Sequence, residues 1–129
     1  MKFIHISDLH IGKKLNEFSL AEDQRHILGE ILKIADTERP DFIFIAGDIY
    51  DKSMPSGEAV EMFDAFLYEL TLLNTNIFII SGNHDSPERI AFGARLMQSS
   101  RVFIAPVYDG TVYKHSLKDD FGLINIYLL

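Results

Sequence analysis

Three short clusters in this sequence contain the residue types that bind metal ions in proteins. They are Asp8-Leu9-His10, Gly47-Asp48-Ile49-Tyr50-Asp51 and Gly82-Asn83-His84-Asp85. The chain contains no cysteine, so thiolate metal sites and disulfide bonds are excluded. Any metal ion must therefore be held by carboxylate, imidazole or amide groups.

Each cluster directly follows an apolar run that predicts a strand. Strands are expected over residues 2–7, 42–46, 77–81, 102–104, 111–115 and 122–129, and helices over residues 19–38, 55–73 and 87–98. A hairpin turn is expected at Asp109–Gly110. The first strand is expected to be buried on both faces, with His5 as a hydrogen-bonded core histidine.

Apolar strands that alternate with helices are typical of a mainly parallel sheet covered on both faces. In such sheets the loops after the strands emerge at one edge, where ligands bind. Two divalent ions about 3.5–4 Å apart require a bridging carboxylate, and Asp48 is the candidate bridge. Asp8 and His10 are expected to hold one ion, and Asn83 the other. Gly47 and Gly82 allow the sharp backbone turns that this crowding requires.

The composition indicates one domain without a membrane span. Its 129 residues and 47% hydrophobic content suit a single folded core. The strand-like start leaves no room for a secretory signal, so a cytoplasmic location is expected. The net charge of −7 argues against a simple DNA-binding module. It argues less against a metalloenzyme, because bound ions neutralise clustered carboxylates and attract phosphate.

The motifs DxH, GDxxD and GNHD, in this order, resemble those of the calcineurin-like metallophosphoesterase superfamily. The longer strings FIHISDLHIGKK, FIFIAGDIYDKSMPS and IFIISGNHDSPERI are similar to its bacterial SbcD branch of DNA nuclease subunits. The resemblance covers essentially the whole chain. It implies an α/β fold, namely the N-terminal half of the calcineurin-like fold, in which a mainly parallel sheet flanked by helices is completed by a second sheet.

The resemblance also implies a site and its partners. Asp8, His10, Asp48 and Asn83 match the metal ligands of the family, and His84 matches its catalytic histidine. The family uses manganese, which suits carboxylate, amide and imidazole ligands. The SbcD branch cuts double-stranded DNA at ends and hairpins, together with an SbcC-type ATPase subunit.

The mechanism we infer is an in-line attack on a DNA phosphodiester by a metal-activated hydroxide. His84 would stabilise the departing oxygen or protonate it as a general acid. Asp85 would orient that imidazole or support the metal site, and Asp51 would support the metal ligands. Arg89 is the better candidate for a DNA phosphate contact. Lys13, beside Lys14, is a second candidate, although a solvated loop is an equally good interpretation there.

One part of the family pattern is missing. The superfamily completes its site with a lone histidine and a later GHxH pair, and neither is present here. The chain also stops in an apolar strand, at residues 124–129. We therefore expect residues 1–129 to be the N-terminal part of one nuclease domain, which alone binds metal weakly and cleaves little.

Two questions stay open at this stage. The core motifs would also suit a calcineurin-like phosphoesterase acting on nucleotides, phosphoproteins or lipid head groups, and the missing histidines would suit a non-catalytic scaffold. The second helix carries two apolar stripes where packing on a sheet needs one. The extra stripe is explained either by burial in the rest of the domain or by a homodimer contact through residues 57–73 and 88–98.

Overall fold

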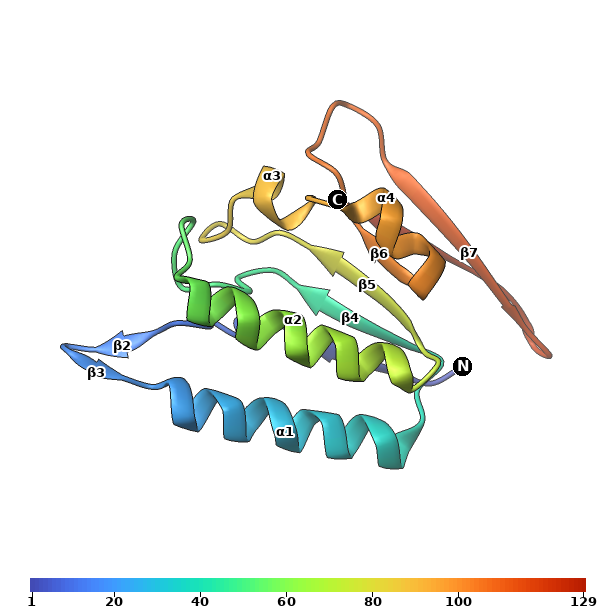
Figure 1. The fold of residues 1–129 in the computed structure, drawn as a ribbon. Helices are drawn as coiled ribbons and strands as arrows, with labels where there is room; N and C mark the ends of the chain where they lie inside the picture. The colour runs from blue at the N-terminus through green and yellow to red at the C-terminus, as the bar shows by residue number, and fades with distance from the viewer.

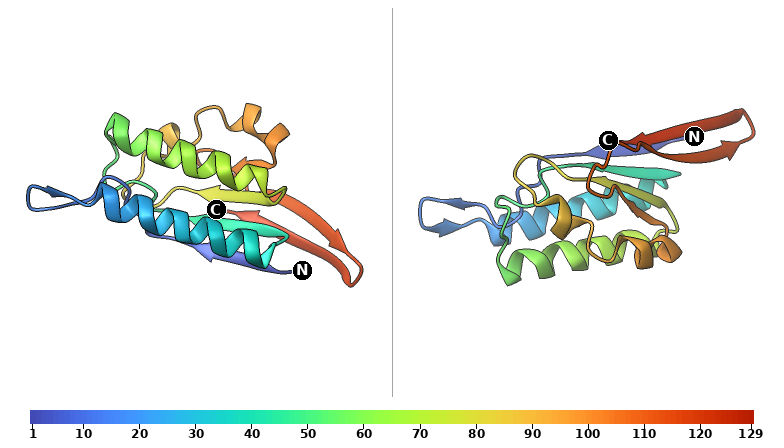
Figure 2. Two further views of the ribbon diagram at one scale, coloured as in Figure 1. Left: turned by 60° about the horizontal axis from the view of Figure 1, so that its bottom comes forward. Right: turned by 90° about the horizontal axis from the view of Figure 1, so that it is seen from above.

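A four-stranded parallel sheet forms the centre of the fold. The computed structural model describes residues 1–129 (Figure 1). The strands lie in the order β1 (Phe3–Ile6), β4 (Phe42–Ala46), β5 (Asn76–Ile80) and β6 (Val102–Ile104), and every neighbouring pair is parallel. The carboxyl ends of β1, β4 and β5, which precede the three polar clusters, therefore meet at one edge of the sheet (Figure 2).

Two long helices, α1 (Ala21–Glu38) and α2 (Gly57–Leu72), lie side by side on one face of the sheet (Figures 1 and 2). Ser56 begins α2, because its side chain accepts a hydrogen bond from the Ala59 backbone N–H at 3.2 Å. Apolar side chains of both helices and of β4 and β5 form the main core. None of the helices combines the length and the apolar character that a membrane crossing requires.

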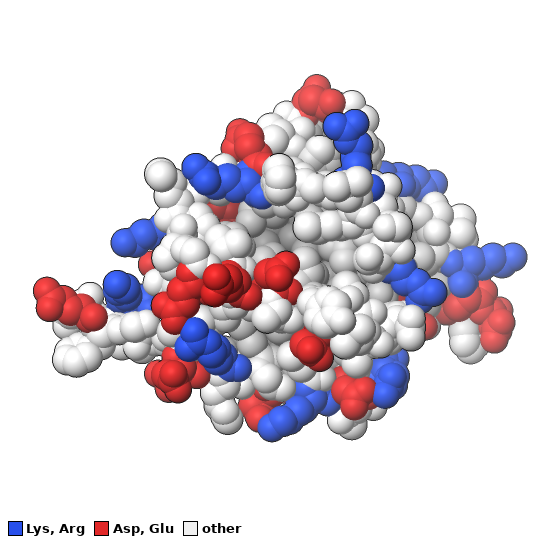
Figure 3. All heavy atoms as spheres, viewed as in Figure 1, with Lys and Arg blue, Asp and Glu red and all other residues white.

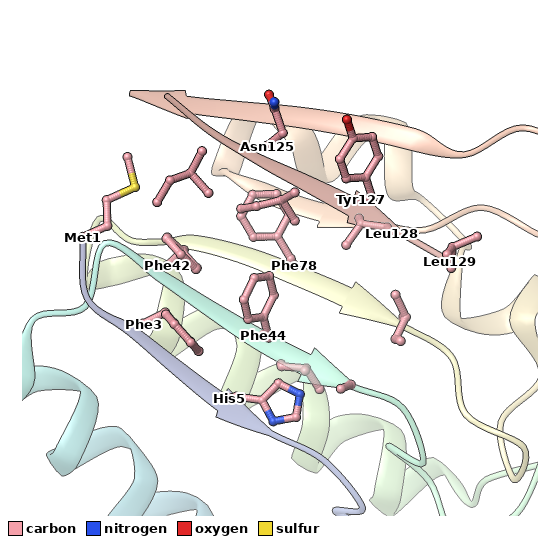
Figure 4. Close-up of a pocket in the computed structure, with 15 residues that line it drawn as sticks. Met1, Phe3, His5, Phe42, Phe44, Phe78, Asn125, Tyr127, Leu128 and Leu129 are labelled. Carbon is pink, nitrogen blue, oxygen red and sulfur yellow. The ribbon is translucent and has the colours of Figure 1, made fainter. Parts of the chain in front are cut away.

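An antiparallel hairpin covers part of the opposite face. Its strands are β7 (Tyr113–Asp119) and β8 (Gly122–Leu128), and Ile126 and Leu128 pack on Phe42 and Phe78. Beside this contact lies an apolar groove of about 510 Å³, lined mainly by aromatic side chains of β1, β4 and β5 and by β8 (Figure 4). The groove contains none of the candidate ligands. The parallel sheet with flanking helices is thus confirmed, but the long helices cover one face only.

The first strand differs from its prediction. β1 is an edge strand, and Phe3 is 56% exposed on the face that the hairpin leaves open. The expected burial of β1 on both faces was therefore wrong. His5 is also exposed, with its ring set edge-on to Phe44 at a centroid distance of 6.3 Å. It is not the buried histidine that the apolar sequence around it predicted.

The expected third helix is broken into shorter pieces. These are α3 (Pro87–Ile90), α4 (Ala94–Met97) and the 3₁₀ turn η1 (Gln98–Ser100). Gly93 separates α3 from α4 with φ of 74°, a left-handed conformation that a continuous helix does not contain. The apolar spacing over residues 87–98 had suggested one helix because both pieces place apolar residues at similar intervals.

Two further differences concern hairpins. The turn of the last hairpin lies between Asp119 and Gly122, not at Asp109–Gly110, because the Asp119 carboxylate accepts the backbone N–H groups of Phe121 and Gly122. A small hairpin of β2 (Lys14–Leu15) and β3 (Phe18–Ser19), which was not expected, projects between the first cluster and α1 (Figure 1).

Candidate metal centre

The three polar clusters meet at the carboxyl edge of the sheet. Ligand atoms of His10, Asp48 and His84 all lie within 4.8 Å of one another. These residues come from the loops after β1, β4 and β5, so parallel pairing brings together side chains that are far apart in the chain. A group of two imidazoles and a carboxylate has the composition of a divalent metal site.

The first two loops are joined by hydrogen bonds that continue the pairing of β1 with β4. The N–H of Asp8 donates to Gly47 O at 3.1 Å, and the N–H of His10 donates to Asp48 O at 2.9 Å. The N–H of Ile11 donates to Ile49 O at 2.8 Å. The backbone of both loops is therefore fixed like the sheet itself, and the side chains of His10 and Asp48 start from a rigid base.

Three candidate ligands have left-handed backbone conformations. The φ angles are 56° at Asp8, 44° at His10 and 49° at Asp48. Residues other than glycine rarely adopt this region, although aspartate, asparagine and histidine do so more often than most. The conformation also occurs outside the site, at Asn16, Arg39, Asn74 and Arg101. Each candidate ligand tolerates the conformation because hydrogen bonds of the neighbouring loop hold it in place.

Two glycines allow the loop after β4 (the second loop) and the loop after β5 (the third loop) to touch. A β-carbon on Gly47 would lie 2.7 Å from the Gly82 α-carbon, and one on Gly82 would overlap the Asp48 carboxylate and backbone nitrogen. No larger residue fits at either position without moving the backbone. The roles expected for Gly47 and Gly82 at crowded turns agree with this geometry.

His10 lies among carboxylates. Its Nε2 is 3.8 Å from an Asp8 oxygen and 3.9 Å from an Asp48 oxygen, and its Nδ1 is 3.7 Å from an Asp51 oxygen. These separations exceed hydrogen-bond length. The buried Nδ1 has no hydrogen-bond partner. A buried polar atom without a partner is rare, and a role in binding an ion is one explanation for it.

His84 is fixed by two contacts of a different kind. Its backbone N–H donates to the Asp48 carboxylate at 2.9 Å, and its ring Nδ1 lies 3.0 Å from the Asp51 carbonyl oxygen. A carbonyl only accepts hydrogen bonds, so the Nδ1-protonated ring suits this contact and leaves Nε2 available for proton exchange. The ring meets His10 edge-on, with centroids 4.9 Å apart.

Asp85 organises the backbone. This buried carboxylate accepts the N–H groups of Ile49 at 3.1 Å, Tyr50 at 2.9 Å and Gly82 at 2.9 Å. It makes no hydrogen bond to the His84 ring. Of the two roles that the sequence left open for Asp85, these contacts favour support of the site, because they tie the second loop to the third.

The remaining candidates are more exposed. The Asn83 side chain is exposed and makes no hydrogen bond to the cluster, and the Asp8 side chain is 67% exposed. Arg89 on α3 and Lys13 before β2 are exposed and make no ion pair. Both are free to contact an anion. Asp51 lies beside both histidines, with a carboxylate oxygen 3.7 Å from His10 Nδ1 and its carbonyl oxygen 3.0 Å from His84 Nδ1.

Electrostatics around the site favour cations. Burial raises the pKa of Tyr50 to about 12, and the nearby Asp85 and Asp64 carboxylates add to this shift. Acidic side chains also gather near the first turns of α1 and α2, beside the ion pairs of Arg25 with Glu22 and Glu58 (Figure 3). This face offers no continuous basic track for a DNA backbone.

Gln24 is a residue of the site that sequence reasoning missed. It lies in α1, and its side chain hydrogen-bonds to the loop that carries His10. A glutamine near the start of a helix is commonly solvated, so its type and position gave no signal.

Comparison with known proteins agrees with the motifs. Residues 1–127 match the model of the family described as calcineurin-like phosphoesterase. The SbcD subunit of the nuclease SbcCD from Staphylococcus epidermidis is 41% identical over 105 residues, and the same subunit from Staphylococcus saprophyticus is 40% identical over 105 residues. The matched segment covers 81% of this chain but only 28% of each relative.

Proposed function

Because this chain belongs to the calcineurin-like phosphoesterase family, we propose that it supplies the N-terminal part of a two-metal phosphodiesterase that hydrolyses DNA. The observation that carries the proposal is the meeting of His10, Asp48 and His84 at one edge of the sheet. The similarity to the SbcD subunit of the nuclease SbcCD supports DNA as the substrate. The match covers only 28% of each relative, which supports the proposal that residues 1–129 are the first part of a longer nuclease domain.

The residues present fit divalent metal ions. The buried Nδ1 of His10 has no other partner, and three carboxylates surround the ring. Asp8 and His10 would hold one ion, Asn83 the other, and Asp48 would bridge them. Oxygen and imidazole ligands without thiolate suit Mn²⁺. Asn83 and Asp8 are exposed enough to turn toward the ions.

The ions and the side chains would have different roles in the reaction. When bound, the ions would activate a water molecule for in-line attack and neutralise charge on the phosphate. His84 would protonate or stabilise the departing oxygen through Nε2, since Nδ1 faces the Asp51 carbonyl. Asp85 would keep the second and third loops at a fixed separation, and Asp51 would hold the His84 ring. Arg89 and Lys13 would contact DNA phosphates.

The test uses the protein encoded by the complete reading frame, labelled linear duplex DNA and a small phosphodiester. We expect Mn²⁺-dependent loss of duplex that disappears in His84→Ala. The matched control His26→Ala, on the exposed face of α1, should retain it. Turnover of the small ester with intact duplex would assign the site to another phosphoesterase. No turnover of either would support a non-catalytic scaffold.

The isolated 129-residue chain provides a second test. We propose that it binds Mn²⁺ weakly and cleaves little, because the lone histidine and the GHxH pair are absent from it. Duplex cleavage by the isolated chain at a rate near that of the longer protein would contradict this.

A homodimer forms part of the proposal. Val60, Tyr68 and Leu72 are exposed on α2, and Phe92 and Leu96, beyond β5, are each 82% exposed. These residues belong to the segments 57–73 and 88–98. Light scattering of the longer protein should give a dimer that Phe92→Glu dissociates and Phe18→Glu, on the β2–β3 hairpin, does not. A monomeric native protein would exclude the dimer.

An SbcC-type ATPase is the proposed partner, because the similar proteins belong by name to the nuclease SbcCD. Roles in DNA repair, recombination and replication, and a cytoplasmic location, belong to the same proposal. Co-purification of the longer protein with an SbcC-type ATPase would support it.

A further inference from the structure

The side chain of Gln24 makes three hydrogen bonds to one short backbone segment. Its Oε1 accepts the Gly12 N–H at 3.0 Å. Its Nε2 donates to the carbonyl oxygen of His10 at 2.7 Å and lies 3.3 Å from that of Leu9. These contacts join the start of α1 to the loop after β1, between residues that are 12 to 15 positions apart in the chain.

One backbone contact also reaches this segment from its own turn, because the Lys13 N–H donates to the His10 carbonyl oxygen at 3.1 Å. The N–H groups of His10 and Ile11 donate hydrogen bonds to the loop after β4, so that loop fixes one side of the segment after β1. The carbonyl oxygens of Leu9 and His10 contact the Gln24 side chain, and His10 has the left-handed φ of 44°. Gln24 is therefore the side chain that holds the carbonyl side of this strained residue.

We propose that Gln24 is a positioning residue that sets the backbone, and hence the imidazole, of His10 for metal binding. The metal-binding part of this inference rests on the proposed function. Gln24 does not touch the reacting atoms; it acts through the loop. A side chain in this place must accept from one N–H and donate to carbonyl oxygens at once, and a primary amide does both.

The chemistry makes Gln24→Glu a sharp test. A carboxylate retains the acceptor for Gly12 but places a second acceptor against the His10 and Leu9 carbonyl oxygens. It also adds a negative charge near the site. Charge alone would tighten cation binding, whereas loss of positioning would weaken it. The two effects therefore predict opposite signs. Gln98→Glu, at the exposed second glutamine of the chain, is the matched control.

The first measurement needs no metal ion. Amide hydrogen exchange in the 129-residue chain should be roughly tenfold faster at His10, Ile11 and Gly12 in Gln24→Glu, because the loop opens locally. Exchange at Ile43 and Ile79 in the core strands should be unchanged, which shows that the fold is intact. Native protection at His10 and Ile11 would overturn the proposal.

The second measurement is Mn²⁺ affinity by titration calorimetry. Gln24→Glu should weaken Mn²⁺ binding by about tenfold or more, the range seen when partners of metal ligands are changed. Gln98→Glu should bind like the native chain. Equal or tighter binding by Gln24→Glu would overturn the positioning role. If instead Asp48→Asn left Mn²⁺ binding unchanged, the metal site would fail, while the exchange data would still decide the role of Gln24.

Discussion

The α-carbon of Gly82 lies so close to the Asp48 carboxylate that not even a methyl group fits between them. Gly82→Ala should therefore displace the candidate bridging ligand and lower the free energy of unfolding by about 2 kcal/mol or more. Urea denaturation and Mn²⁺ titration measure the two effects. Gly29→Ala, in an open part of α1, should raise the free energy of unfolding by roughly 0.5–1 kcal/mol. Equal effects at both glycines would refute the steric interpretation.

Asp85 should contribute mainly to stability. Asp85→Asn replaces one acceptor oxygen by a donor that faces the N–H groups of Ile49, Tyr50 or Gly82. We expect a loss of about 3 kcal/mol in unfolding free energy, because the charged acceptor is removed and at least one buried N–H group is left facing an amide donor. Asp109→Asn is the control, since its exposed carboxylate accepts only the Thr111 N–H. A loss below that of the control would contradict the assignment.

Tyr50 should make stability fall at high pH. Its pKa is raised to about 12 in the folded protein, so the neutral form is favoured by folding. The stabilisation is complete below the unfolded pKa of about 10 and is lost as the pH rises toward 12. Denaturant midpoints across this range should decline less steeply in Tyr50→Phe. Parallel curves for the two proteins would show that Tyr50 does not titrate as expected.

Ser56 should stabilise α2 through its side chain. Ser56→Ala removes the acceptor of the Ala59 N–H and should lower the unfolding free energy by about 1 kcal/mol. Ser86→Ala before α3 removes no such bond, because the Ser86 hydroxyl instead contacts Glu88. Thermal unfolding that shifts equally in both variants would argue against the cap.

The sheet and the meeting of the three clusters were predictable, because both follow from the order of apolar runs and the polar residues directly after them. Apolar runs such as residues 42–46 fix strand type, and parallel order places the residues after them at one edge. The β2–β3 hairpin was not predictable, since each strand has only two residues and therefore no period to detect. Gly93 breaks a helix whose apolar spacing continues across the break.

Side-chain roles were less predictable than side-chain types. Asp48 and His10 were identifiable because metal ligands follow strands in a recognisable order. The three backbone partners of Asp85 depend on the path of two loops 36 positions apart, which no local pattern encodes. His5 was misjudged because its apolar neighbours indicate a strand but do not indicate whether it lies at an edge.

The left-handed backbone at Asp8, His10 and Asp48 has a consequence for the evolution of this chain. Asp48 gains from its side chain, because the carboxylate accepts the His84 N–H. Glycine would relieve the strain at Asp8 and His10, whose side chains make no hydrogen bond, so the stability of the fold conflicts with the retention of these two side chains. Selection for thermal stability alone should replace Asp8 and His10 by glycine. If both residues are retained when the protein is selected in the laboratory for stability and activity together, function and not folding maintains this edge of the sheet.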